Sequence, residues 1–109
     1  MAPRLEIFPE SPQTINKGHS VLYQCNVVAG APRPVITWSR TDQRPLTSNT
    51  EVLPGGLLRI TRTTGEEEGE YRCRVENTAG SVEATTSLTI LADDVEADKQ
   101  GEYLLSKPP

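Results

Sequence analysis

The sequence predicts an all-β protein in which two antiparallel sheets pack face to face. Two segments that alternate apolar and polar residues carry one cysteine each, Cys25 and Cys73. A third such segment carries Trp38, thirteen residues after Cys25. Because alternate side chains of a strand point to opposite faces, both thiols and the indole are expected to face the space between the sheets. A separation of 48 residues between the cysteines is the spacing expected for a disulfide that joins two packed sheets beneath an indole.

Each expected strand is an alternating segment bounded by turn residues. The first strand is expected to be split, because Pro9 and Pro12 interrupt an alternation that starts at Leu5 and resumes at Gln13. Proline excludes a central position in a sheet, so this strand is predicted to lie at an edge and to switch sheets. Further strands are expected at about residues 19–28, 35–40, 58–60, 69–76 and 81–90, with one or two short strands within 46–53.

These motifs resemble those of the immunoglobulin superfamily, and in particular its intermediate, or I-set, domains. The matching stretches cover about residues 5–91: Gly30-Ala31-Pro32-Arg33-Pro34 ahead of Trp38, Leu58-Arg59-Ile60, Gly69-Glu70-Tyr71-Arg72-Cys73, and Asn77-Thr78-Ala79-Gly80. The resemblance implies an immunoglobulin-like Greek-key β-sandwich, with Trp38 as a core marker and Tyr71 as a tyrosine corner. Glu67 stands where the family usually has aspartate, so a salt bridge at this position is not carried over.

Length and composition fit one domain followed by a short tail. A chain of 109 residues can bury one core but not two. We expect the domain at residues 5–91, preceded by a linker or the start of an expressed fragment at 1–4. The first four residues lack the apolar run of a secretory signal. Residues 92–109 carry five of the fifteen acids and are expected to be an acidic linker or disordered tail.

Charge and cysteine content restrict the partners and the compartment. A formal net charge of −4 argues against nucleic acid, whose phosphates need clustered lysine and arginine. No stretch of eighteen apolar residues is present, so no membrane insertion by this fragment is expected. A disulfide between Cys25 and Cys73 favours an oxidising, extracellular compartment. The alternative is an intracellular sarcomeric or cytoskeletal I-set domain with reduced cysteines.

Catalytic, metal and cofactor chemistry are not expected. Nucleophilic catalysis needs a positioned base, and the one histidine, His19, lies at the edge of a strand without an evident partner. Cys25 and Cys73 lack the paired spacing of zinc ligands. The run Glu66-Glu67-Glu68 is expected to be a solvated acidic turn, because charge runs usually face water.

Recognition by a sheet face is the function that remains. Arg72 and Arg74 are expected to point outward, side by side, on the strand that carries Cys73. Arginine is enriched at binding hot spots because its planar fork makes bidentate contacts, so these two are the first candidates for touching a partner. The competing hypothesis is that they pair across strands with Glu76 or Glu83 and serve solubility. Arg33, between two prolines, is a further candidate.

A narrower resemblance indicates what such a domain would bind. The segments 27–38, 55–60 and 68–74 resemble the tandem immunoglobulin modules of perlecan-type basement-membrane heparan sulfate proteoglycans. This resemblance implies a non-catalytic, extracellular interaction and spacer module of a larger matrix or adhesion protein. Its expected partners are the neighbouring domains of the full-length chain and a matrix glycoprotein such as nidogen.

Overall fold

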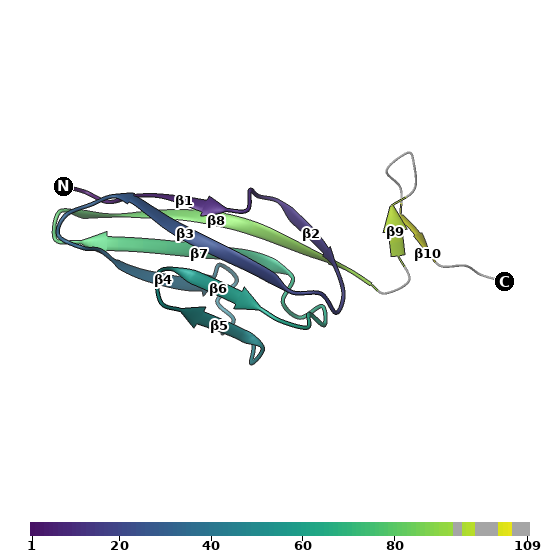
Figure 1. Cartoon of the computed structure of the whole chain (residues 1–109). Coiled ribbons are helices and arrows are strands. Elements are labelled where there is room, and N and C mark those ends of the chain that lie inside the picture. The colour runs from purple at the N-terminus through teal and green to yellow at the C-terminus, as the bar shows by residue number, and fades with distance from the viewer. Residues whose placement is uncertain (93–94, 98–102, 106–109) are drawn as a thin grey trace.

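A computed structural model, which describes residues 1–92, 95–97 and 103–105, shows two four-stranded sheets packed on each other (Figure 1). The first sheet has the strand order β1-β3-β6-β5, and all of its strand pairs are antiparallel. Its strands are β1 (Arg4–Phe8), β3 (Val21–Ala29), β6 (Leu57–Ile60) and β5 (Thr50–Leu53). Within the described residues no helix is long and apolar enough to cross a membrane.

The second sheet has the strand order β2-β8-β7-β4. Its strands are β2 (Gln13–Asn16), β8 (Gly80–Leu91), β7 (Gly69–Asn77) and β4 (Val35–Arg40). The chain crosses between the sheets from β3 to β4 and again from β6 to β7, as a Greek key requires. The predicted all-β sandwich is therefore confirmed.

The split of the first strand is also confirmed. β1 pairs antiparallel with β3 in the first sheet, whereas β2 pairs parallel with β8 in the second. Pro9 and Pro12 lie between the two halves, where neither has to donate a ladder hydrogen bond. Both halves occupy sheet edges, as expected for a strand that proline interrupts.

The core lies between the sheets around a disulfide. Cys25 on β3 and Cys73 on β7 are bonded, with their Cα atoms 6.4 Å apart, so the bond joins the two sheets. Trp38 pairs with Cys73 in the ladder between β4 and β7, and its indole N–H donates to the carbonyl of Gly56 at 3.0 Å. The core is completed by buried side chains from four strands, β3, β6, β7 and β8: Tyr23, Leu58, Ile60, Tyr71, Val75 and Leu88. The predicted cysteine and tryptophan frame is confirmed.

The segment 46–53 contains one short strand, β5, which pairs with β6, in agreement with the one or two expected there. One boundary differs from the sequence-based expectation. The strand that carries Cys25 begins at Val21 instead of residue 19, because the backbone of His19 turns away to bond Thr63.

The tail contains strands that the sequence analysis did not predict. Val95–Ala97 forms β9 and Tyr103–Leu105 forms β10, and the two pair antiparallel. The other residues of the expected tail after Ala92 lie outside the described part, and the division into domain and tail stays a prediction.

The residues that precede β1 contact two loops. The Met1 carbonyl accepts hydrogen bonds from the Ala31 amide at 3.1 Å and from the side-chain amide of Asn77 at 2.9 Å. The amino group of Met1 donates to the carbonyl of Ala31 at 2.8 Å. Pro3 is buried against Gly30. This segment therefore joins the β3–β4 loop to the β7–β8 turn.

Candidate functional site

The outer face of the β4-β7-β8 sheet carries both first-choice arginines. Because Cys73 points inward, the residues on either side of it in β7, Arg72 and Arg74, point outward. In the strand register, Arg72 lies between Ser39 and Thr85, and Arg74 lies between Thr37 and Glu83. The neighbours on β4 are small, so both guanidinium groups are accessible from solvent.

Both arginines are already paired with acids on the same face. Arg74 lies 3.0 Å from a carboxylate oxygen of Glu83 and 3.6 Å from one of Glu76, and Arg72 lies 3.6 Å from the other oxygen of Glu83. The cross-strand pairing that the sequence offered as a competing role is thus present. Surface pairs of this kind contribute about 0.2–1 kcal/mol each. The side chains of Arg72 and Arg74 remain 38% and 43% exposed, so pairing leaves them available to a partner.

Arg33 lies elsewhere. It is exposed in the loop between β3 and β4 and stands at the rim of a cleft of about 780 Å³. This cleft is lined by two edge strands and a turn, with Ile36 of β4 and Val52 of β5 on opposite sides. The three candidate arginines therefore belong to two surfaces, one a flat sheet face and the other a hollow at the edge of the sandwich.

The other end of the same edge holds a buried arginine that sequence reasoning missed. The side chain of Arg40, at the end of β4, is 2% exposed. Its guanidinium donates to both carboxylate oxygens of Asp42, at 3.2 and 3.0 Å. It also donates to the carbonyls of Glu66 at 2.9 Å and Glu68 at 2.7 Å. Its planar group lies over the Tyr71 ring, 5.4 Å from the ring centroid. Arg40 thus ties β4 to the turn that precedes β7.

The electrostatics of Arg40 follow from these contacts. Burial alone would lower the pKa of Arg40, but the hydrogen bonds that it donates to Asp42, together with the nearby Tyr71 and the carboxylates of Asp42 and Glu67, raise that pKa above its ordinary value. In return, the Arg40 hydrogen bonds, with help from the Arg44 amide, hold the pKa of Asp42 below its ordinary value. Both groups are therefore charged at neutral pH.

Glu67 corrects one expectation from the sequence. It is 1% exposed, whereas the run 66–68 was expected to be a solvated turn. Its carboxylate accepts hydrogen bonds from the amides of Thr64 at 2.8 Å and Gly65 at 3.0 Å, and from the side chain of Asn49. Burial alone would raise the pKa of Glu67, but these hydrogen bonds outweigh it and lower the pKa. Glu66 and Glu68, on either side, are exposed, so the prediction was wrong for the middle residue alone.

Tyr71 forms the expected tyrosine corner. Its hydroxyl donates to the backbone carbonyl of Glu67, four residues earlier. Burial raises the pKa of Tyr71 to about 12, although the nearby Arg40 works in the opposite direction. The ion pairs of the described residues do not include Glu67. The substitution of glutamate for the usual aspartate therefore leaves a carboxylate held by neutral donors.

A sequence signal for Arg40 existed. Ile36, Trp38 and Arg40 alternate along β4, so Arg40 shares the inward direction of the indole. An arginine at an inward position needs partners for its five N–H donors, and here they come from the 66–71 segment. The pairing of these two segments could not be read from the sequence without knowing the fold.

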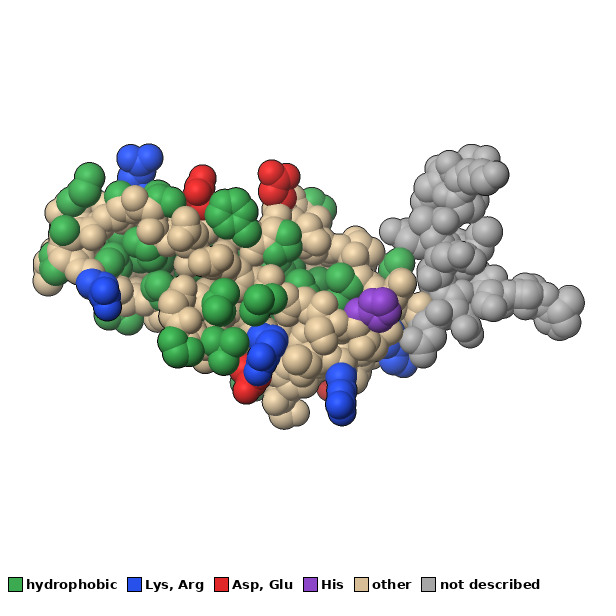
Figure 2. All heavy atoms as spheres, in the orientation of Figure 1, with side chains coloured by type: hydrophobic (Ala, Val, Ile, Leu, Met, Phe, Trp, Pro, Cys, Tyr) green, Lys and Arg blue, Asp and Glu red, His purple; other side chains and the backbone are tan. Residues whose placement is uncertain are grey.

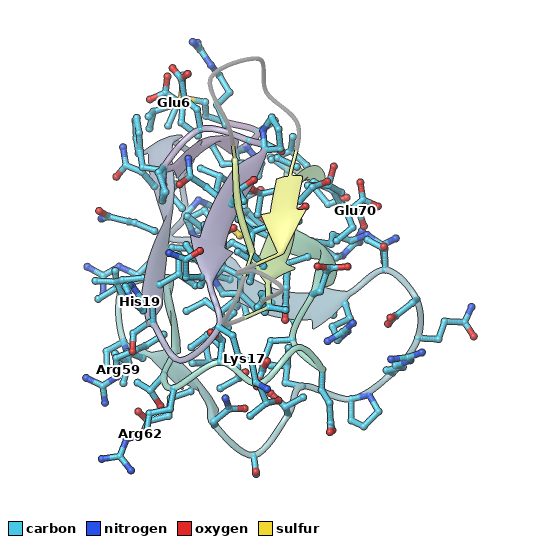
Figure 3. All side chains as sticks on the ribbon, turned by 90° about the vertical axis from the view of Figure 1, so that its right-hand side faces the viewer. Glu6, Lys17, His19, Arg59, Arg62 and Glu70 are labelled. Carbon is cyan, nitrogen blue, oxygen red and sulfur yellow. A yellow bond between two sulfur atoms is a disulfide. The ribbon has the colours of Figure 1, made fainter. Side chains whose placement is uncertain are left out.

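The remaining polar candidates show no catalytic or metal-binding arrangement in the described part of the chain. His19 is exposed, and its backbone carbonyl accepts hydrogen bonds from the amide and hydroxyl of Thr63. Figure 3 shows His19, Arg59 and Arg62 along one side of this end of the domain, with Glu70 on the opposite side. The described residues contain no cluster of three or more histidine, cysteine or acidic side chains that could hold a metal ion.

The fold and these surfaces define the class of protein. A disulfide-linked Greek-key sandwich with a tyrosine corner is an immunoglobulin-type β-domain. Residues 3–90 match the family model of the immunoglobulin I-set domain. The chain belongs to the immunoglobulin I-set domain family.

Two curated proteins are related to this chain over one short segment of their length. Protein sax-3 of Caenorhabditis elegans is 37% identical over 91 residues, which cover 83% of this chain. Neuronal-glial cell adhesion molecule of Gallus gallus is 35% identical over 99 residues, which also cover 83% of this chain. The chain spans only 7% of the length of each.

Two solved structures share the fold at 27% identity. Domains 3–5 of the extracellular part of Drosophila OTK match with a TM-score of 0.70, covering 82% of this chain and 31% of that one. The titin M3 domain matches with a TM-score of 0.69, covering 84% of this chain and 98% of that one. The I-set resemblance seen in the sequence is confirmed.

Proposed function

We propose that this chain is a non-catalytic, extracellular interaction and spacer module of a larger adhesion or matrix protein. The observation that carries the proposal is the outer face of β4, β7 and β8, where two arginines stand half-exposed in the middle strand. The bond between Cys25 and Cys73 supports an oxidising compartment. The similarity to a neuronal-glial cell adhesion molecule and to extracellular domains of OTK supports the same location.

The arginine face suits protein recognition for a physical reason. Glu83 contacts both guanidinium groups, which reduces the rotamer freedom that a partner would otherwise have to remove. Arg72 and Arg74 keep exposed N–H donors beside the hydroxyl groups of Ser39, Thr37 and Thr85. Such a surface favours a partner with carboxylate or carbonyl acceptors.

A finer form of the proposal names the parent and partner. The sequence resemblance to perlecan-type proteoglycans favours a basement-membrane protein, with nidogen as the matrix glycoprotein to test. The relatives reported above support the broader adhesion class and do not single out a proteoglycan. The alternative is an intracellular structural domain of sarcomeric type, which the likeness to the titin M3 domain supports.

Charge reversal tests the proposed face. We expect R72E/R74E to lose binding to a matrix extract and to purified nidogen, with folding verified by circular dichroism. The matched control is R59E, because Arg59 is an exposed arginine on the other sheet that likewise pairs with a glutamate, Glu51. Unchanged binding by R72E/R74E, or equal loss in R59E, would remove this face from the proposal.

Thiol counting tests the compartment. We expect mass spectrometry after alkylation of the natural protein, taken directly from its tissue, to find Cys25 and Cys73 unmodified and bonded. Alkylation of both thiols before any reduction step would favour the intracellular alternative.

A further inference from the structure

We propose that the cleft between β4 and β5 binds an extended segment of a partner protein that presents a branched apolar side chain next to a carboxylate. This cleft is separate from the arginine face of β4, β7 and β8, and its test is independent of the tests above.

The cleft lies where both sheets end. Among the strands that the structure describes, β4 is the last strand of one sheet and β5 the last strand of the other. The space between them stays open near the β3–β4 loop and forms a hollow of about 780 Å³. Figure 2 shows hydrophobic side chains gathered over β5, at the lower edge of the molecule in that view.

The lining combines apolar walls with a single charge. Ile36 and Val52 face each other across the hollow, and Val27 and Leu53 extend the apolar surface. Val52 pairs with the buried Leu58 in the ladder between β5 and β6, so its side chain points to the same, inner side of the sheet. It is nevertheless 51% exposed, because β5 lies at the open edge. A branched side chain of a partner would cover this surface.

Arg33 supplies the charge and selects an acidic ligand. It is the only ionisable side chain among the lining residues, and it is exposed. The ion pairs of the described residues do not include Arg33. This differs from Arg72 and Arg74, which form ion pairs with Glu83 and, for Arg74, also with Glu76. A carboxylate beside the apolar group of the ligand would therefore find an uncompensated guanidinium.

Backbone groups at the rim favour an extended peptide over a small apolar molecule. Thr41 donates from its amide to the carbonyl of Glu70, which continues the ladder between β4 and β7. Antiparallel pairs alternate, so the N–H and C=O of Ile36 point away from β7 toward the open edge. The bond from the Thr61 amide to the Asn49 carbonyl places the same groups of Val52 at the free edge of β5. A strand-like segment has backbone groups that can meet them.

The floor of the cleft is held in place, so little ordering is needed on binding. The carbonyl of Gly56 accepts hydrogen bonds from the Cys25 amide at 2.9 Å and from the Trp38 indole at 3.0 Å. Gly55 and Gly56 have φ values of 87° and 86°, a conformation that glycine adopts without strain. A Cβ on Gly55 would meet no atom within 4 Å, whereas Gly56 packs so closely against the Cys25 carbonyl that a Cβ there would lie 2.5 Å from its oxygen. A preformed pocket loses less affinity to conformational entropy.

The experiment is a titration of the isotope-labelled chain with capped peptides, followed by amide chemical shifts. Acetyl-Gly-Leu-Asp-Gly-amide should shift the amides of Val52, Gly55 and Gly56. Acetyl-Gly-Leu-Asn-Gly-amide should bind roughly two- to fivefold more weakly, the loss expected for one exposed ion pair. Acetyl-Gly-Ala-Asp-Gly-amide should also bind more weakly, because it buries less apolar surface.

Two variants locate the site on the chain. R33E should abolish the preference for aspartate, whereas R4E, which makes the same charge change at another exposed arginine, should keep it. V52F should block the hollow, since Val52 lines it at a half-exposed position and a larger side chain there would occupy the space open to a ligand.

Three results would overturn the proposal. Shifts confined to other residues would place the binding elsewhere. Equal binding of the aspartate and asparagine peptides, or no effect of R33E, would reduce the cleft to an apolar hollow without selectivity. Concentration-dependent shifts at Val52, Gly55 and Gly56 in the absence of peptide would show that a second copy of the chain occupies it.

Discussion

The two ends of the β4–β5 edge solve the problem of closing a sandwich in opposite ways. At one end charged groups are buried, with Arg40 at 2% side-chain exposure and Glu67 at 1% residue exposure, each held by several hydrogen bonds, and the hollow beside Glu67 is only about 370 Å³. At the other end the turn before β6 has two glycines, and a hollow remains. The difference shows that buried polar groups can close an edge when their hydrogen bonds are made, whereas a glycine turn that packs tightly on β3 leaves space beside it.

Removing the charge at the closed end should have the largest effect. R40M keeps most of the apolar stem but leaves the carbonyls of Glu66 and Glu68 without their donor. We expect a loss of about 3 kcal/mol in the free energy of unfolding, as for other buried charged networks that lose one partner. Urea denaturation followed by tryptophan fluorescence measures it.

The control for this prediction is R44M. Arg44 also approaches Asp42, at 3.6 Å, but its side chain is 70% exposed, so its loss should cost less than about 0.5 kcal/mol. If R40M and R44M unfolded at the same urea concentration, the closed end would not depend on the buried guanidinium.

Adding a methyl group at the open end should have an intermediate effect that depends on which glycine receives it. A Cβ on Gly56 would lie 2.5 Å from the carbonyl oxygen of Cys25, whereas a Cβ on Gly55 would meet nothing within 4 Å. Both residues have positive φ, so both variants pay the same backbone strain of about 1 kcal/mol. We expect G56A to lose about 2–3 kcal/mol and G55A only about 1 kcal/mol.

Thermal unfolding of the two glycine variants in parallel isolates the steric part. Equal losses would mean that the backbone strain alone decides, and that the close approach of Gly56 to β3 does not constrain the floor of the cleft.

Acid should destabilise the closed end, where the carboxylates of Glu67 and Asp42 lie. We expect this loss of unfolding free energy to be smaller than the losses in R40M and in the glycine variants. The pKa of Glu67 is lowered on folding, so its contribution to stability is present above the unfolded-state value of about 4.3 and is lost as the pH falls through the lower folded-state value. Asp42 titrates in the same direction. We expect the unfolding free energy of the wild type to fall with pH in this window, and that of E67Q to fall less steeply.

The measurement is a series of urea unfolding curves between neutral and acidic pH. The variant D42N separates the exposed carboxylate from the buried one. Parallel curves for E67Q and the wild type would contradict the assigned role of the Glu67 carboxylate.

Much of the fold could be predicted because the relevant signals are local. Pro9 and Pro12 indicate the split first strand, and the alternation around Cys25, Trp38 and Cys73 indicates the inward residues of three strands. These predictions need only the period of a strand and the absence of a donor on proline.

The site could be predicted less well because it depends on contacts between distant segments. Arg72 and Arg74 were placed on the correct face by alternation alone, but their shared partner Glu83 required the register of β8. The buried carboxylate of Glu67 accepts a hydrogen bond from the side chain of Asn49. Asn49 belongs to the segment 46–53, for which the sequence did not indicate a pairing strand. The cleft at Arg33 could not be predicted from the sequence, because its walls depend on where β5 lies and on the conformation of the turn at Gly55 and Gly56.

The link between Cys25 and Cys73 also sets how far the domain can stretch. The start of the chain and the end of β8 lie at opposite ends of the sandwich (Figure 1), so a pull on neighbouring domains would act along its length. The two sulfurs close a loop with a sequence separation of 48, and this loop cannot lengthen even when both sheets come apart. At roughly 3.4 Å per extended residue, the bond withholds on the order of 160 Å of contour. In a tandem array, an oxidised domain that unfolds under load would therefore extend less than a reduced one by about this length.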